Sequence, residues 1–110
     1  MIRKYCLALD LKDDAALIAE YEAYHKKVWP EIIQSIKGSG ITSMEIYRTG
    51  NRLFMIMETD ESFSFEKKQK ADELNSKVQE WETLMWKYQQ KLPHAGINDK
   101  WILMDKIFSL

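Results

Sequence analysis

Residues 41–59 read ITSMEIYRTGNRLFMIMET, and this stretch decides the fold. Polar and large apolar side chains alternate on both sides of Gly50-Asn51, a dipeptide typical of two-residue hairpin loops. A loop at these residues predicts four cross-strand pairs: Ile46–Met55 and Met44–Met57 on one face, and Tyr47–Phe54 and Glu45–Ile56 on the other. The first face is apolar and is expected to face the core. The second is mixed but still rich in large apolar groups.

The segments on either side of the hairpin predict one strand and one helical layer each. Before it, residues 4–11 (KYCLALDL) are typical of a buried strand, residues 15–28 of a helix, and residues 30–38 (PEIIQSIKG) of a second helical segment. After it, residues 62–92 are predicted to be helical with a break near Leu74-Asn75, and residues 100–110 (KWILMDKIFSL) form the last predicted strand.

Capping and breaking residues mark the ends of these helices. Asp13 or Asp14 is the expected N-cap of the first helix, and Gly38 and Gly40 are expected to end the second helical segment. Pro93 is expected to end the last helix. Apolar stripes that should face the core run through Leu17, Tyr21, Tyr24 and Val28, and through Val78, Trp81, Met85, Tyr88 and Leu92.

The order of elements is β-α-β-β-α-β, which indicates an α+β, ferredoxin-like fold in a single domain spanning residues 1–110. Two helical layers can cover only one face of the sheet, so the other face would present Tyr47, Phe54 and Ile56. Such an apolar patch usually meets a partner, and two sheets packed face to face in a homodimer would bury it. A monomer with loops folded over the sheet is the alternative.

Composition narrows the class of protein. Hydrophobic residues make up 45% of the 110 residues, charged residues make up 30%, and the net charge is −1. No basic field is present to attract nucleic acid or an anionic membrane. The single cysteine, Cys6, fits a reducing compartment, and the apolar run near the N-terminus stops at Asp10, too short for a signal peptide. We therefore expect a cytoplasmic protein that binds neither nucleic acid nor membrane.

The segment EYEAYHKKVWPEI, residues 20–32, contains the strongest candidate for chemistry. Tyr21 and His25 are four residues apart, so one helical face presents both. A neutral imidazole gives or takes a proton near physiological pH, and Trp29 could supply a flat apolar wall. A pocket of this composition suits a monosaccharide, whose hydroxyls need polar partners and whose C–H faces pack on rings. The alternative is a partly buried histidine among aromatic core residues.

Other residues carry weaker signals. His94 lies in a loop, and no cluster of Cys, His and Asp has the spacing of metal ligands, so we predict no metal. No glycine-rich phosphate loop follows a strand, and no cofactor is expected. Glu45 is a candidate second acid/base group if it reaches the pocket. Trp86 lies off the apolar stripe, either as an aromatic at the rim of a ligand site or as an exposed ring.

Three motifs together give the chain a family resemblance. The start MIRK, the run Y-x-x-x-H-x-x-x-W-P-E at residues 21–31, and the ending IFSL resemble the L-rhamnose mutarotase family. The resemblance implies a dimeric α/β barrel built from ferredoxin-like subunits. It also implies an enzyme that interconverts the α and β anomers of a 6-deoxy sugar without a cofactor. The run from residue 9 to residue 32, with MEIYR and LFMIMET, is similar to a branch associated with L-fucose.

The resemblance assigns roles to several residues. It implies that His25 is the proton donor, that Tyr21 binds the sugar, and that Trp81 is the first member of a tryptophan pair at the sugar. Glu82 stands where the second tryptophan is expected, and Trp86 competes for that position. Met44 falls where the family has a second sugar-binding tyrosine, and a methionine cannot donate the hydrogen bond of a phenol.

The predicted reaction opens the pyranose ring by delivering a proton to the ring oxygen and removing one from the anomeric hydroxyl. His25 is expected to transfer protons, while Glu45, a bound water or Tyr21 is the second group. Two alternatives stay open on the sequence. Cofactor-free monooxygenases and lactone isomerases share this topology, and a non-enzymatic dimerisation or binding module would use the aromatic residues as core.

Overall fold

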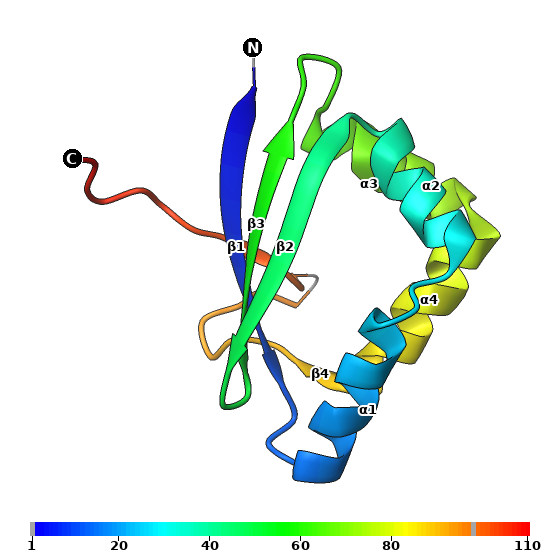
Figure 1. Ribbon diagram of the computed structural model, residues 1–110, viewed down its shortest axis with the longest axis vertical. Coiled ribbons are helices and arrows are strands. Elements are labelled where there is room, and N and C mark those ends of the chain that lie inside the picture. The colour runs from blue at the N-terminus through cyan, green and yellow to red at the C-terminus, as the bar shows by residue number, and fades with distance from the viewer. Residues whose placement is uncertain (1, 98) are drawn as a thin grey trace.

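The computed structural model describes residues 2–97 and 99–110, which form five strands and four helices (Figure 1). Met1, in the predicted family motif, and Asn98, in the predicted loop after Pro93, lie outside the described residues. The strands are β1 (Arg3–Leu11), β2 (Ile41–Thr49), β3 (Arg52–Thr59), β4 (Gln89–Gln90) and β5 (Ile102–Leu103). The helices are α1 (Ala15–His25), α2 (Pro30–Gly38), α3 (Phe65–Leu74) and α4 (Ser76–Trp86).

The sheet has the strand order β2-β3-β1-β4, and β5 also pairs with β1. Every pairing is antiparallel. The four predicted hairpin pairs are all present: Ile46–Met55, Met44–Met57, Tyr47–Phe54 and Glu45–Ile56. This order and register confirm the predicted ferredoxin-like α+β fold. The subunit is an open sheet with helices against it and is not a closed barrel.

Local capping explains where the helices begin. The Asp14 side chain accepts a hydrogen bond from the Leu17 backbone N–H at 3.1 Å and caps α1. Ser64 caps α3 in the same way. Asn75 ends α3 and caps α4, with its Oδ1 accepting from the Val78 N–H at 3.2 Å. The break predicted near Leu74-Asn75 is therefore confirmed, and a capping asparagine produces it.

Three predicted helix ends are wrong. α1 ends at His25 instead of Val28, because Pro30 restricts the backbone of Trp29 and begins a new helix. The long helical region begins at Phe65, after the Ser64 cap, and ends at Trp86. Pro93 therefore does not end α4. The chain leaves the helix earlier because Gln89–Gln90 pairs with the edge of β1.

The last predicted strand is also too long. Only Ile102–Leu103 of residues 100–110 pairs with β1, opposite Leu7 and Ala8. Residues 104–110, here called the C-terminal tail, leave the body on the side of the sheet away from the helices (Figure 1). A strand needs a partner strand, and the described chain offers this tail none beyond the Met104 N–H bond to the Cys6 carbonyl at 2.8 Å.

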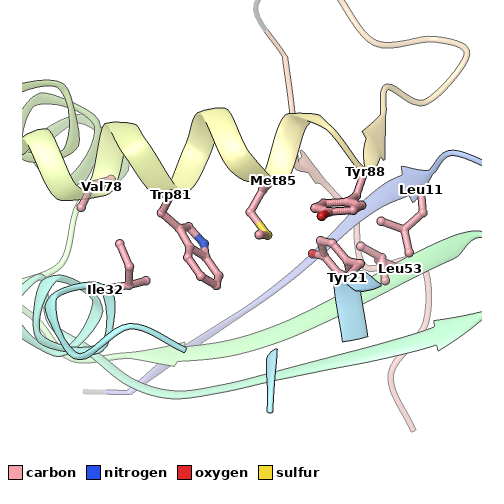
Figure 2. Close-up of a cluster of buried hydrophobic side chains, with 8 residues drawn as sticks. All are labelled: Leu11, Tyr21, Ile32, Leu53, Val78, Trp81, Met85 and Tyr88. Atoms are coloured by element: carbon pink, nitrogen blue, oxygen red, sulfur yellow. The ribbon is translucent and has the colours of Figure 1, made fainter. Parts of the chain in front are cut away.

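The core lies between the sheet and the helices. Its larger cluster joins Leu11 and Leu53 of the sheet to Tyr21, Ile32, Val78, Trp81, Met85 and Tyr88. Figure 2 shows Val78, Trp81 and Met85 projecting from α4 to the same side, towards Ile32 and Tyr21. Both predicted stripes are therefore the core-facing sides of their segments. The second cluster joins Leu7, Ile41, Met55, Met57 and Phe63.

Candidate active site

A cavity of about 610 Å³ lies between the sheet and the helical layer. Its walls are mostly apolar and include Ile32, Met44, Met57, Val78 and Met85. Polar side chains also line it, among them Tyr21, His25, Gln89 and the ion pairs Glu82–Lys100 and Lys68–Asp72. A mostly apolar hollow with few polar groups is the usual composition of a small-molecule site. The volume lies within the usual range of ligand pockets and is ample for a monosaccharide.

His25 is the last residue of α1, and its ring is partly buried against the cavity. Its Nδ1 lies 2.8 Å from the carbonyl oxygen of Tyr21. A carbonyl oxygen only accepts, so Nδ1 carries the proton and Nε2 is the free nitrogen of the neutral ring. Burial lowers the pKa of His25 below its ordinary 6.5, although the bond to Tyr21 partly offsets this. The ring is therefore neutral at pH 7, with Nε2 ready to accept a proton.

Tyr21 lies one turn before His25 and is only 3% exposed. The two rings are 4.4 Å apart between centroids. The Tyr21 hydroxyl oxygen accepts a hydrogen bond from Nε2 of Gln89 at 3.4 Å. Burial raises the pKa of Tyr21 to about 12, against a smaller lowering by the Gln89 bond. The phenol therefore keeps its proton at neutral pH and acts on a ligand as a hydrogen-bond group and not as a base.

Trp81 of α4 forms the aromatic wall beside the histidine. Its ring centroid lies 5.7 Å from that of His25, in an edge-on arrangement. The ring also packs edge-on against Trp29 at 5.1 Å and Tyr24 at 6.3 Å. These neighbours hold the indole rigid, and such rigidity favours stacking on the C–H face of a ligand.

The structure brings four of the predicted site residues to one cavity: Tyr21, His25, Met44 and Trp81. Trp29 supports Trp81 from behind and lines a separate hollow with Tyr24 and Pro30. Trp86 does not line the cavity, and its ring lies under the Lys100 ammonium at 5.1 Å. Glu45 is exposed on the opposite face of the sheet, where it accepts a hydrogen bond from the Tyr47 hydroxyl at 3.3 Å.

Sequence reasoning missed many of the residues that line the cavity, among them one glutamine, one tryptophan and one ion pair. Gln89 and Trp101 both line the cavity, and Lys100 pairs with Glu82 at 2.9 Å on its wall. No local pattern marks Gln89 as buried, because its inward position comes from the pairing of β4 with β1. Nothing local predicts Trp101 or the Glu82–Lys100 pair, since β5 brings residues 100 and 101 to the cavity from the far end of the chain.

No group of three or more His, Cys, Asp and Glu side chains in residues 2–97 and 99–110 is arranged to hold a metal ion. None of the helices in that part of the chain has the length and apolar character that a membrane crossing requires.

Comparison with known proteins gives the family. The sequence model of L-rhamnose mutarotase matches residues 4–110. The chain belongs to the L-rhamnose mutarotase family. Membership confirms the resemblance carried by the Y-x-x-x-H-x-x-x-W-P-E run, and it places the protein among the mutarotases, which are isomerases that act on sugars.

Two relatives can be aligned with nearly the whole length of this mutarotase-family chain. An L-fucose mutarotase of Xanthomonas campestris pv. campestris is 41% identical over 111 residues, covering 99% of this chain and 89% of the relative. A UPF0734 protein of Dictyostelium discoideum is 39% identical over 115 residues, covering 98% of this chain and 90% of the relative. The crystal structure of an L-rhamnose mutarotase from Formosa agariphila has a TM-score of 0.72 at 20% identity, covers 98% of both chains and shares the fold.

Proposed function

We propose that this protein interconverts the α and β anomers of a 6-deoxy-L-hexose, with L-fucose as the preferred sugar. The observation that carries the proposal is the free Nε2 of His25 at the wall of an aromatic-lined cavity. Family membership supports the reaction class. The L-fucose mutarotase that is 41% identical over nearly the whole chain supports the choice of sugar.

Ring opening needs two proton transfers, and the protein ends each cycle in the protonation state in which it began. In our proposal the neutral Nε2 of His25 removes the proton of the anomeric hydroxyl. The C1–O5 bond then breaks as the C1 carbonyl forms, and the imidazolium returns its proton to O5. Rotation about C1–C2 and the reverse steps close the ring on the other face. O1 and O5 are bonded to the same carbon, so one nitrogen serves both in turn.

The remaining cavity residues bind and orient the sugar in this proposal. The neutral Tyr21 phenol hydrogen-bonds to a sugar hydroxyl, and the Trp81 ring stacks on the C–H face. Met44 packs against the 6-methyl end, which needs no hydrogen bond. Trp29 acts through Trp81, by holding its ring. Glu45, on the other face of the sheet, takes no part within the subunit.

Exchange spectroscopy by NMR tests the proposal, because it reads the rate of anomer interconversion at equilibrium. We expect the protein to accelerate exchange of L-fucose and, less strongly, of L-rhamnose, and to leave D-glucose near the buffer rate. Heat-denatured protein at the same concentration is the control. Equal rates with native and denatured protein on both 6-deoxy sugars would reject the proposed function.

We also propose that the protein works as a homodimer. The sheet face opposite the helices, here called the open sheet face, presents Tyr47 at 53% exposure together with half-buried Phe54 and Ile56. The C-terminal tail carries Ile107 and Phe108 at 95% and 75% exposure. In a symmetric dimer each tail would cover the open sheet face of the other copy, which buries both apolar surfaces at once.

A cytoplasmic location completes the proposal, and the free thiol of Cys6 suits that reducing compartment.

A further inference from the structure

Gln89 is a polar side chain in a place where the fold does not need one. It lies on the two-residue strand β4, opposite Leu11 of β1, and is only 4% exposed. Its neighbour Gln90 points the other way and is exposed, as strand alternation requires. Gln89 lines the cavity together with Tyr21 and His25. The inward position of the strand is therefore occupied by an amide at the wall of the proposed sugar site.

Only one end of this amide has a partner. Its Nε2 donates to the Tyr21 hydroxyl oxygen at 3.4 Å, but its Oε1 is buried with no hydrogen-bond partner among the described residues. A buried acceptor without a partner destabilises a folded protein, and natural interiors contain few of them. A leucine or methionine would fill the same space without that penalty. The unpaired oxygen is therefore best explained by a donor that arrives with a ligand.

The chemistry of the oxygen defines that donor. An uncharged carbonyl oxygen repels carboxylate and phosphate oxygens and accepts from a hydroxyl. The surrounding wall is mostly apolar, and its Lys68–Asp72 and Glu82–Lys100 pairs each carry no net charge, which favours a neutral ligand with both hydroxyls and C–H faces. Gln89 and His25 both form a hydrogen bond with Tyr21. Gln89 bonds to the Tyr21 hydroxyl, while the Tyr21 carbonyl accepts from His25. Gln89 and His25 both contact Tyr21 and line the same cavity, so a single sugar bound there could meet both residues.

We propose that Gln89 is a specificity-determining residue, whose Oε1 accepts a hydrogen bond from one ring hydroxyl of the sugar. This inference rests on the proposed function. By binding one hydroxyl while its Nε2 bonds to the Tyr21 phenol, Gln89 fixes which carbon of the ring lies against His25. An epimer with that hydroxyl on the other side of the ring leaves the amide oxygen unpaired. Gln89 therefore contributes to the distinction between L-fucose and L-rhamnose, which differ in the stereochemistry of their ring hydroxyls.

Comparison of Gln89→Met with wild type across a substrate series tests this inference. The series contains the preferred 6-deoxy-L-hexose and its analogues that lack the hydroxyl at C2, C3 or C4. We expect Gln89→Met to lower kcat/KM on the parent sugar by about ten- to a hundredfold, the usual effect of leaving one such polar group unpaired. On one of the three deoxy analogues, wild type and variant should differ by less than about twofold, because the hydrogen bond is absent in both. Gln90→Met is the matched control and should match wild type on every sugar.

Wild-type protein alone provides a second measurement that does not depend on the variant folding. One deoxy analogue should lose about ten- to a hundredfold in kcat/KM relative to the parent sugar. The analogue with fluorine at the same position should lose as much, because fluorine cannot donate a hydrogen bond to Oε1. Equal kcat/KM on all analogues with wild type would overturn the inference.

The outcomes separate this inference from the proposed function. A uniform loss with Gln89→Met on every sugar, while wild type is active, assigns Gln89 a structural role and overturns only the inference. No loss at all with a folded Gln89→Met variant has the same meaning. Wild-type protein that accelerates no sugar rejects the proposed function and this inference with it.

Discussion

Nδ1 of His25 lies 2.8 Å from the carbonyl oxygen of Tyr21, one helical turn earlier in α1. This contact places the ring proton on Nδ1 and leaves Nε2 as the exchanging atom. It also places the imidazole at the end of the helix, against the Trp81 wall of the cavity. The position, tautomer and charge of the proposed proton carrier all follow from one backbone bond and partial burial.

The pH dependence of the rate should follow the neutral form of His25. Burial lowers the pKa of His25 below 6.5, so the neutral ring persists to a lower pH than it does in an unfolded chain. The protein-dependent part of kcat/KM should therefore level off towards pH 8 and fall on acidification, with its half-point below pH 6.5, at the folded-state pKa. Exchange rates measured from pH 4.5 to 8, less the buffer rate at each pH, check this. A half-point at or above pH 6.5, or a rise on acidification, would contradict the assignment.

Trp81 and Trp86 provide a matched pair of tryptophans on one helix. Trp81 lines the cavity, and Trp86, five residues later, does not. Trp81→Phe shortens the aromatic wall and should raise KM for the sugar about two- to tenfold, the usual worth of one aromatic contact. Trp86→Phe should leave KM unchanged. Steady-state exchange kinetics on both variants measure KM, and thermal unfolding shows whether each variant is folded. Equal changes in KM for the two variants would contradict the proposal that Trp81 contacts the sugar.

The hairpin and the break between the last two helices were predicted correctly, because local residues determine both. The hairpin register follows from alternation around Gly50-Asn51, and the break at Asn75 follows from a side chain that caps the next helix. Two of the wrong helix ends have local causes, the restriction that Pro30 places on Trp29 and the Ser64 cap, and the other errors occur where a distant partner decides. The pattern of residues 87–92 suits a helix, but the edge of β1 takes Gln89–Gln90 as a strand. The C-terminal tail has the composition of a strand, but none of the strands among the described residues pairs with it.

Some residues of the candidate site could be predicted from local patterns, and others reach it only through distant pairing. Tyr21 and His25 could be predicted together because they share one helical face. The apolar stripe predicts Trp81 only as a core-facing residue, and its place at the sugar came from the family resemblance. Gln89, Lys100 and Trp101 reach the cavity only through pairing of β4 and β5 with β1, which no local pattern reveals. Glu45 was a candidate because its residue type suits acid/base chemistry. The alternation of β2 turns it to the other face.

Gly40 and Gly38, which precede β2, differ in whether the structure has room for an added Cβ. Gly40 has a φ of 96°, and an added Cβ would lie 2.6 Å from both Asp60 Oδ1 and Ser62 Oγ. Gly40→Ala should therefore lower the free energy of unfolding by about 1–3 kcal/mol. Gly38, at the end of α2, has nothing within 4 Å of an added Cβ. Gly38→Ala should raise the free energy of unfolding by about 0.5–1 kcal/mol. Urea denaturation at unchanged m-value measures both changes, and equal midpoints for the two variants would contradict the account.

The proposed dimer predicts that two separate surfaces act as one interface. Tyr47→Glu on the open sheet face and Phe108→Glu in the C-terminal tail should each raise the dimer dissociation constant by at least about tenfold, because each buries a charge against apolar groups. Leu74→Glu is the control, since Leu74 is exposed on α3, away from both surfaces. Sedimentation velocity over a concentration series gives the association state. A wild-type monomer at 100 µM, or variants that associate as tightly as wild type, would reject the interface.

The most direct test of the central claim is the anomer exchange rate of L-fucose at pH 7 with His25→Asn. Asparagine keeps a polar group of similar reach and cannot carry a proton through Nε2. His94→Asn, which alters an exposed loop residue, serves as the control. We predict that His25→Asn lowers the protein-dependent rate by about a hundred- to ten-thousandfold, the usual contribution of one positioned acid/base group, while His94→Asn keeps the wild-type rate. A folded His25→Asn variant that exchanges L-fucose as fast as wild type would contradict the account.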